Sequence, residues 1–169
     1  MNLSGKISKK SRGGGSEKKY FRVQFSNVLL YDFFNKIGIE NNKSLTINKV
    51  NVPAALMPDF LRGLLDGDGS ITIFNHPESQ FAQIRIRFSS ASKIFLVWLQ
   101  KELKLVANGG YILRSSRCWQ LIYAKIDSIG LIKYMYYKNN VVCLGRKERL
   151  ARHCLGLQIG EDGVKFKND

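Results

Sequence analysis

Residues 80–90, QFAQIRIRFSS, constrain the fold most, because apolar and polar side chains alternate along the stretch. Such alternation is typical of an antiparallel strand with one packed face and one open face. The apolar face consists of Ala82, Ile84, Ile86 and Phe88, and the polar face of Gln83, Arg85 and Arg87. The chain is therefore expected to contain a sheet whose apolar side is covered by other elements.

The surrounding pattern predicts what covers that sheet. Helical periodicity at 58–66, 92–104, 127–138 and 146–155 alternates with strand patterns at 70–74, 80–90 and 109–125, the last read as a hairpin turning at Ser115 and Ser116. Pro58 is placed at the start of the first helix, and Asp127 is expected to cap a later one. The order is helix, two strands, helix, two strands, helix, helix, which indicates an α+β fold.

The N-terminal third has a different character. Residues 1–19 are basic with a GGG at 13–15, which suits a mobile arm or a long hairpin loop. A strand at 20–25 and a helix capped by Ser26 or Asn27 and ended by Gly38 follow, and residues 20–36 match 121–137 in residue class, as a partial repeat. We predict an arm and partial repeat over 1–52, a main domain over 53–155 and a polar tail over 156–169.

Charge is the informative bulk property. The 169 residues contain 27 Lys and Arg against 13 Asp and Glu, a net charge of +14. This favours a nucleic acid as partner and leaves an acidic membrane or a ribosomal-type RNA role open, without choosing DNA over RNA. No apolar run is long enough to span a bilayer and no secretory signal is found, so an intracellular location is expected, in the cytoplasm, nucleoid or an organelle. The three cysteines, Cys118, Cys143 and Cys154, are expected to be reduced.

The stretch FLRGLLDGDG, residues 60–69, joins an apolar helix to two acids. Gly63 costs about 1 kcal/mol of helix propensity, which close contact with another helix would offset. Acids at a helix C-terminus oppose its dipole. A plain DG turn is one explanation, and the other is that Asp68, with the Gly67 carbonyl, holds a divalent cation through oxygen ligands. Spacing alone does not choose between them.

LRGLLDGDG resembles the motif of the LAGLIDADG homing endonucleases. The matching positions are Leu61, Gly63, Leu64, Asp66, Asp68 and Gly69, while Leu65 replaces isoleucine and Arg62 and Gly67 stand where the name has alanine. The predicted order of elements to about residue 155 is also similar to that of the family. The resemblance implies an αββαββα fold with helices on one face of an antiparallel, DNA-binding sheet.

The resemblance further implies a Mg²⁺-dependent DNA endonuclease, with Mn²⁺ as another possible cation. Motif helices of this family pack in pairs, so a chain with one motif is expected to form a homodimer. The interface would include Leu61, Gly63, Leu64 and Asp66. Asp68 would be catalytic and, with Gly67, would bind metal. Lys147 is the expected basic residue near the scissile phosphate, with Arg146 as its rival, and Ser90 stands where many members have glutamine.

The open sheet face supplies the candidate DNA contacts. Arginine can bridge two acceptors of guanine, and glutamine can pair with adenine, in the major groove. The candidates are Ser70, Thr72, Gln83, Arg85, Arg87, Arg114 and Arg117, while the N-terminal lysines would touch phosphates. The expected partner is a long, partly palindromic duplex. Two alternatives stay open: a regulator or intron maturase that does not cleave, and one half of a split two-motif enzyme.

Overall fold

The structure is a computed structural model that describes residues 6–11, 20–24, 26–40, 43–75, 77 and 82–156. It separates into two units, Met1–Lys36 and Ile37–Asp169. Most of the predicted basic arm and the tail beyond Gly156 lie outside the described residues. None of the helices in these ranges has the length and hydrophobicity that a membrane span requires.

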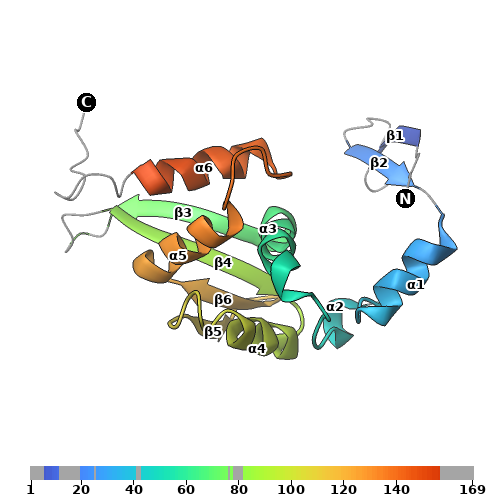
Figure 1. Cartoon of the computed structure of the whole chain (residues 1–169), viewed down its shortest axis with the longest axis horizontal. Coiled ribbons are helices and arrows are strands. Elements are labelled where there is room, and N and C mark those ends of the chain that lie inside the picture. Colours follow the sequence, from blue (N-terminus) through green and yellow to red (C-terminus); the bar gives the residue numbers. More distant parts are fainter. Residues whose placement is uncertain are drawn as a thin grey trace. The chain divides into compact units, whose positions relative to one another are not determined.

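The first unit is a hairpin followed by a helix (Figure 1). Strand β1 (Lys6–Lys10) pairs antiparallel with β2 (Tyr20–Gln24), and helix α1 (Val28–Lys36) follows. The Asn27 Oδ1 atom accepts a hydrogen bond from the Leu30 amide at 2.9 Å, as expected of a cap. None of the α1 residues is buried. This order of two strands and a helix also occurs later in the chain, at Tyr111–Arg114, Trp119–Tyr123 and Lys125–Met135.

The second unit contains the main α+β domain. Its elements are α2 (Lys43–Thr46), η1 (Ala54–Leu56), α3 (Met57–Asp68), β3 (Gly69–Asn75), β4 (Ala82–Ser90), α4 (Lys93–Glu102), β5 (Tyr111–Arg114), β6 (Trp119–Tyr123), α5 (Lys125–Met135) and α6 (Gly145–Gly156). From α3 onward this is the predicted order. Two of the boundary differences concern the site and the caps: α3 continues through both acids to Asp68, and α5 begins before Asp127, with Ala124 at its N-cap.

The four strands form one antiparallel sheet in the order β3-β4-β6-β5. The predicted alternation of β4 is confirmed: Ile84, Ile86 and Phe88 are at most 2% exposed, whereas Gln83, Arg85 and Arg87 are half-buried on the other side. Leu61 and Leu65 of α3, Leu96 and Leu99 of α4 and Ile132 of α5 belong to the same core. The helices therefore cover one face of the sheet and leave the other to the polar side chains.

The β5-β6 hairpin has a longer turn than the sequence suggested. Arg114 pairs with Trp119, and the Ser115 amide donates to the Cys118 carbonyl at 2.8 Å. Residues 115–118 thus form a four-residue turn. All three cysteines are free thiols, of which Cys154 is buried.

Candidate active site

Helix α3 has one sealed face and one open face. Leu61 and Leu65 are completely buried in the core of their own subunit. On the opposite side, Gly63 and Gly67 are exposed, and a Cβ added to either would meet nothing within 4 Å. Phe60 and Leu64 are half-buried beside them. We call Phe60, Gly63, Leu64 and Gly67 the outer face of α3.

Two of the four expected interface residues do not lie on this outer face. Leu61 has no exposed surface to offer a second copy. Asp66 is turned within its own chain, where its Oδ2 atom accepts from the Leu144 amide at 2.8 Å. Its Oδ1 atom is buried without a hydrogen-bond partner. Only Gly63 and Leu64 of the expected set remain open to a partner.

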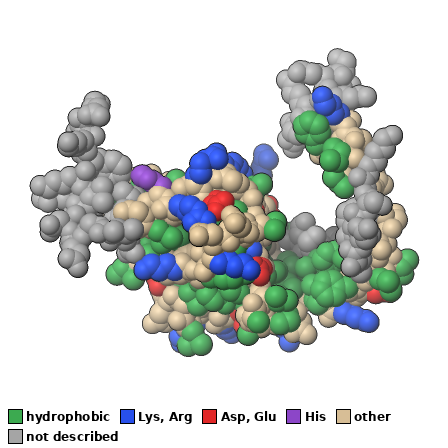
Figure 2. All heavy atoms as spheres, turned by 45° about the horizontal axis from the view of Figure 1, so that its top comes forward, with side chains coloured by type: hydrophobic (Ala, Val, Ile, Leu, Met, Phe, Trp, Pro, Cys, Tyr) green, Lys and Arg blue, Asp and Glu red, His purple; other side chains and the backbone are tan. Residues whose placement is uncertain are grey.

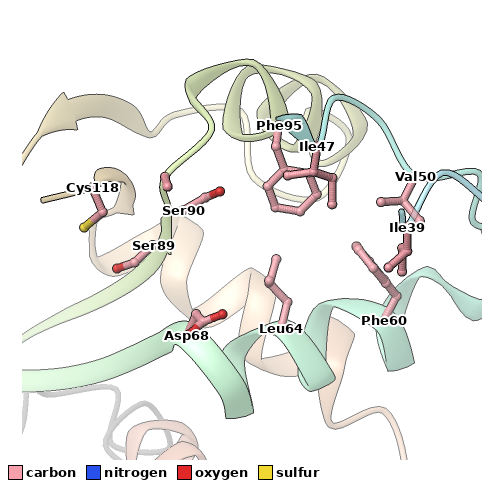
Figure 3. Close-up of a pocket in the computed structure, with 11 residues that line it drawn as sticks. Ile39, Ile47, Val50, Phe60, Leu64, Asp68, Ser89, Ser90, Phe95 and Cys118 are labelled. Atoms are coloured by element: carbon pink, nitrogen blue, oxygen red, sulfur yellow. The ribbon is translucent and has the colours of Figure 1, made fainter. Parts of the chain in front are cut away.

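Asp68 is exposed at the end of α3, at the edge of a pocket of about 400 Å³. Figure 3 shows Asp68 near Ser89, Ser90 and Cys118, while the rest of the pocket is mainly apolar and includes Phe60 and Leu64. The Ser90 hydroxyl accepts from the Ser92 amide at 3.1 Å, so it stabilises the start of α4. The exposed carboxylate thus lies where the outer face of α3 meets the sheet.

The two glycines of the DGDG stretch, Gly67 and Gly69, have different structural roles. A Cβ at Gly69 would lie 2.7 Å from the Leu65 Cα atom and 2.9 Å from its carbonyl oxygen, so only glycine fits this position. Gly67 meets no such restriction and instead leaves open space beside the last turn. Gly69 therefore serves the packing of the chain, and Gly67 leaves room for an approaching molecule.

Lys147 lies against the C-terminal turn of α3. It is 5% exposed, and its Nζ atom donates to the carbonyl oxygens of Asp66 at 3.0 Å, Gly69 at 2.8 Å and also Leu65. Burial, followed by the charge of Arg146, lowers the pKa of the Lys147 ammonium, and the carboxylates of Asp66 and Asp68 act in the opposite direction. Its neighbour Arg146 is exposed. Lys147 thus lies beside the end of α3 that carries Asp68, but its ammonium donates to backbone carbonyl oxygens there.

The sheet brings five of the predicted nucleic-acid contacts onto one face. Ser70 pairs with Arg87, and Thr72 with Arg85, while Gln83 lies two residues before Arg85 on β4. The Arg87 Nη1 atom donates to the Thr72 hydroxyl at 3.2 Å. The Arg85 guanidinium lies 4.8 Å from the centre of the Phe74 ring, a cation–π contact. These contacts hold both arginines over the strands.

Arg114 and Arg117 do not share this face. Arg114 lies on the same face of β5 as Ile112, which pairs with the buried Leu121, so it lies on the helix-covered face of the sheet. The Arg114 guanidinium lies 5.4 Å from the centre of the Trp119 ring. Arg117 lies in the turn. We call the sheet face that carries Ser70, Thr72, Gln83, Arg85 and Arg87 the arginine face. Other residues on this face were not predicted from the sequence, and they include Phe74, Tyr111, Leu113 and Gln120. Knowing the turn length would have revealed the last three through strand alternation.

Charge on the molecule fits a polyanionic ligand. Figure 2 shows Lys and Arg side chains in blue predominating over Asp and Glu in red on the face it presents. Among the described strand positions of the arginine face, none carries an acid. The arrangement is suited to a negatively charged surface that spans several strands.

The donors around Asp68 fit a hard cation only in part. The described residues contain no group of three or more His, Cys, Asp or Glu side chains able to hold a metal ion. One subunit thus offers the Asp68 carboxylate and backbone carbonyls, which are the oxygen ligands that Mg²⁺ prefers.

A comparison with protein families matches residues 56–123 to the LAGLIDADG-like domain. The match includes α3, the acids at its end and the sheet through β6. Residues 56–123 are a LAGLIDADG-like domain. The expected family and α+β fold are confirmed for this part of the chain.

Three solved structures that are similar to the chain are of homing endonucleases in complex with DNA. Two structures of I-CvuI have 15% and 16% identity, and each match covers 62% of this chain and 66% of I-CvuI. The group I intron-encoded homing endonuclease I-CeuI has 20% identity over 77% of this chain and 66% of I-CeuI. The TM-score is 0.48 in all three cases. No curated protein sequence matches the chain.

Proposed function

We propose that this protein is a sequence-specific, Mg²⁺-dependent endonuclease that cuts both strands of DNA as a homodimer. The observation that carries the proposal is the position of Asp68, an exposed carboxylate between the open outer face of α3 and the arginine face of the sheet. Mn²⁺ is expected to replace Mg²⁺, because both accept oxygen ligands.

The outer face of α3 supports a dimer. Two helices approach closely where small residues meet, and Gly63 and Gly67 are four residues apart on the open side. Pairing α3 with its copy would bring two Asp68 carboxylates towards each other. Like charges at short range raise one pKa strongly unless a cation neutralises them. The dimer and the metal are therefore linked in this proposal.

The chain's own residues divide the work between binding and orientation. Asp68, with the Gly67 carbonyl, would hold the cation at the end of α3, next to the start of β3, which is part of the proposed DNA-binding sheet. When bound, the cation would supply charge stabilisation at the scissile phosphate and lower the pKa of a bound water. Arg85, Arg87 and Gln83 would fix the duplex by contacts in the major groove, and cleavage would take place across the minor groove.

The proposed homodimer also gives an expectation for the length of the DNA target. A homodimer carries two copies of the sheet, so the target is expected to be long and partly palindromic. Basic side chains outside the arginine face would contribute phosphate contacts and salt dependence without base recognition. We expect the protein to act inside the cell, where such DNA is found.

The direct test is selection from a randomised duplex library. The full chain is incubated with the library and Mg²⁺, and the newly formed ends are sequenced. The proposal predicts ends clustered at one sequence and none in EDTA. Specific binding without new ends would indicate a regulator or maturase, and cutting that requires a second, different chain would indicate half of a split enzyme.

A further inference from the structure

Helices α3 and α6 cap each other at the candidate site. Asp66, near the C-terminus of α3, accepts a hydrogen bond from the Leu144 amide, which directly precedes the first residue of α6. Lys147, in the first turn of α6, donates to three carbonyl oxygens at the end of α3. Each helix thus supplies the charged side chain that the other helix end requires.

The signs of both contacts are favourable. Amide groups at a helix N-terminus attract a carboxylate, and free carbonyls at a C-terminus attract an ammonium. Asp66 would be unfavourable at the end of its own helix, but its oxygen reaches the start of α6 instead. This explains an acid that the sequence places against its own helix dipole.

The Lys147 ammonium has no donor left for a phosphate. A lysine side chain carries three N–H donors, and its three acceptors here are the carbonyls of Leu65, Asp66 and Gly69. The side chain is also 5% exposed. The carbonyl of Gly67, between these acceptors, is not bound by Lys147. The ammonium therefore encloses the turn that carries Asp68 and leaves the expected metal-binding oxygens free.

We propose that Lys147 is a positioning residue, which fixes the last turn of α3 so that Asp68 and the Gly67 carbonyl face the metal. The role in metal binding rests on the endonuclease function proposed above. The basic side chain open to the DNA phosphates is then Arg146, which is exposed next to Lys147. The two adjacent residues have separate tasks: Lys147 holds the backbone, and Arg146 meets the ligand.

The test compares three variants of the full-length protein. Lys147→Met removes the ammonium, Lys147→Arg keeps donors at the same position, and Arg146→Gln removes the neighbouring exposed charge. The first readout is hydrogen exchange of the Gly69 amide, which donates to the Leu65 carbonyl at the same turn, in protein without metal or DNA. The second readout is the Mn²⁺ concentration that half-saturates the protein when it is bound to a non-cleavable duplex. Mn²⁺ binding is measured by electron paramagnetic resonance.

Lys147→Met should speed Gly69 exchange and raise the required Mn²⁺ about tenfold to a hundredfold, as for residues that orient metal ligands. Lys147→Arg should recover part of both losses. Arg146→Gln should leave Gly69 exchange and Mn²⁺ binding unchanged and weaken DNA binding.

The contrary result is a Lys147→Met protein with normal Gly69 exchange and Mn²⁺ binding that fails to cut at any metal concentration. Lys147 would then act on the phosphate itself. If Lys147→Met does not fold, unchanged exchange and metal binding in Lys147→Arg combined with lost cutting would overturn the proposal in the same way. Gly69 exchange needs neither DNA nor metal, so a wild-type protein that cuts nothing would refute the endonuclease function while the capping role is still measured.

Discussion

At the scale of single residues, Arg62 is a buried cation that ties three segments together. Its Nε atom donates to the Val142 carbonyl at 2.9 Å, its Nη1 atom to the Met135 carbonyl at 2.7 Å, and its Nη2 atom to Asp59. Met135 ends α5, so the guanidinium also faces the negative end of that helix. The sequence marked Arg62 only as a motif variant, because partners about 70 and 80 residues away are not visible in a local pattern.

Replacing Arg62 should destabilise the subunit. Arg62→Met leaves the carbonyl oxygens of Met135 and Val142 without their donor. The Met135 contact is buried, and a buried unsatisfied group costs about 1 to 3 kcal/mol. Val142 is exposed, so water can replace the lost donor there. The free energy of unfolding, measured in urea, should fall accordingly. Asp59→Asn is the matched control and should cost less, because the Asp59 side chain is 39% exposed. Equal stability of Arg62→Met and wild type would refute this account of the buried guanidinium.

The same ion pair predicts a pH dependence. The hydrogen bond from Arg62 is the main cause that lowers the pKa of Asp59 from its ordinary value of 3.8. Because the pKa of Asp59 is lower in the folded state, the unfolded chain takes up this proton at a higher pH than the folded chain does. The stability that the ion pair contributes is therefore complete above pH 3.8. It is lost as the pH falls through the pKa of Asp59 in the folded protein. Wild type should therefore be more stable than Asp59→Asn near neutral pH, and the difference should shrink below pH 3.8. A difference that stays constant down to acid pH would contradict this linkage.

Arg85 and Arg87 predict base recognition. Replacing either with alanine should cost roughly 1 to 3 kcal/mol at particular base pairs, measured by binding to duplexes with single substitutions. Arg117→Ala is the control, because Arg117 lies in the turn outside the arginine face and should lose affinity evenly or not at all. Even losses across all sequences for Arg85→Ala and Arg87→Ala would instead mark phosphate contacts.

At the scale of elements, α3 combines a core face and an open outer face in twelve residues. The sequence predicted an apolar helix around a costly glycine but not which residues face inward. Leu61 was expected at the interface and lies in the core, because apolar character is the same for both surfaces. The alternation of β4, by contrast, was predicted correctly, since a period of two assigns every residue to a face.

The outer face of α3 gives a prediction for this helix. Gly63→Leu should fold, because a Cβ there meets nothing within 4 Å and the helix loses a poor helix former worth about 1 kcal/mol. The added side chain should keep two α3 helices apart, so size-exclusion mass should fall from dimer to monomer and cutting should be lost. Lys101→Leu adds a leucine to an exposed position of α4 and should leave the dimer intact. A Gly63→Leu dimer of normal mass and activity would exclude α3 as the interface.

The turn of the β5-β6 hairpin was not predicted correctly from the local sequence. The turn was expected at Ser115 and Ser116, but four residues form it, and this places Arg117 off the strands. Alternation then sets Arg114 on the Trp119 side and Tyr111 and Leu113 on the arginine face. A single error in turn length changed the predicted nucleic-acid contacts at the far strand, while those on β3 and β4 stayed together.

At the scale of the whole molecule, the order of elements and the net charge of +14 followed from the sequence, whereas the contacts of the acids did not. Asp66 and Lys147 are 81 residues apart, and their reciprocal caps depend on how α6 packs beside the end of α3. Asp68 is the acid left exposed after these contacts are made. The central claim is that this carboxylate, contributed by each of two copies, is needed for cutting and not for binding.

The measurement that tests this claim most directly is cleavage of the selected duplex by Asp68→Asn in Mg²⁺, with binding of the same duplex measured in parallel. Asparagine keeps the size of the side chain and removes the charge that holds a cation. We predict normal binding and no cut in either strand for the variant, against cuts in both strands for the wild type. An Asp68→Asn protein that cuts as fast as the wild type would contradict the account.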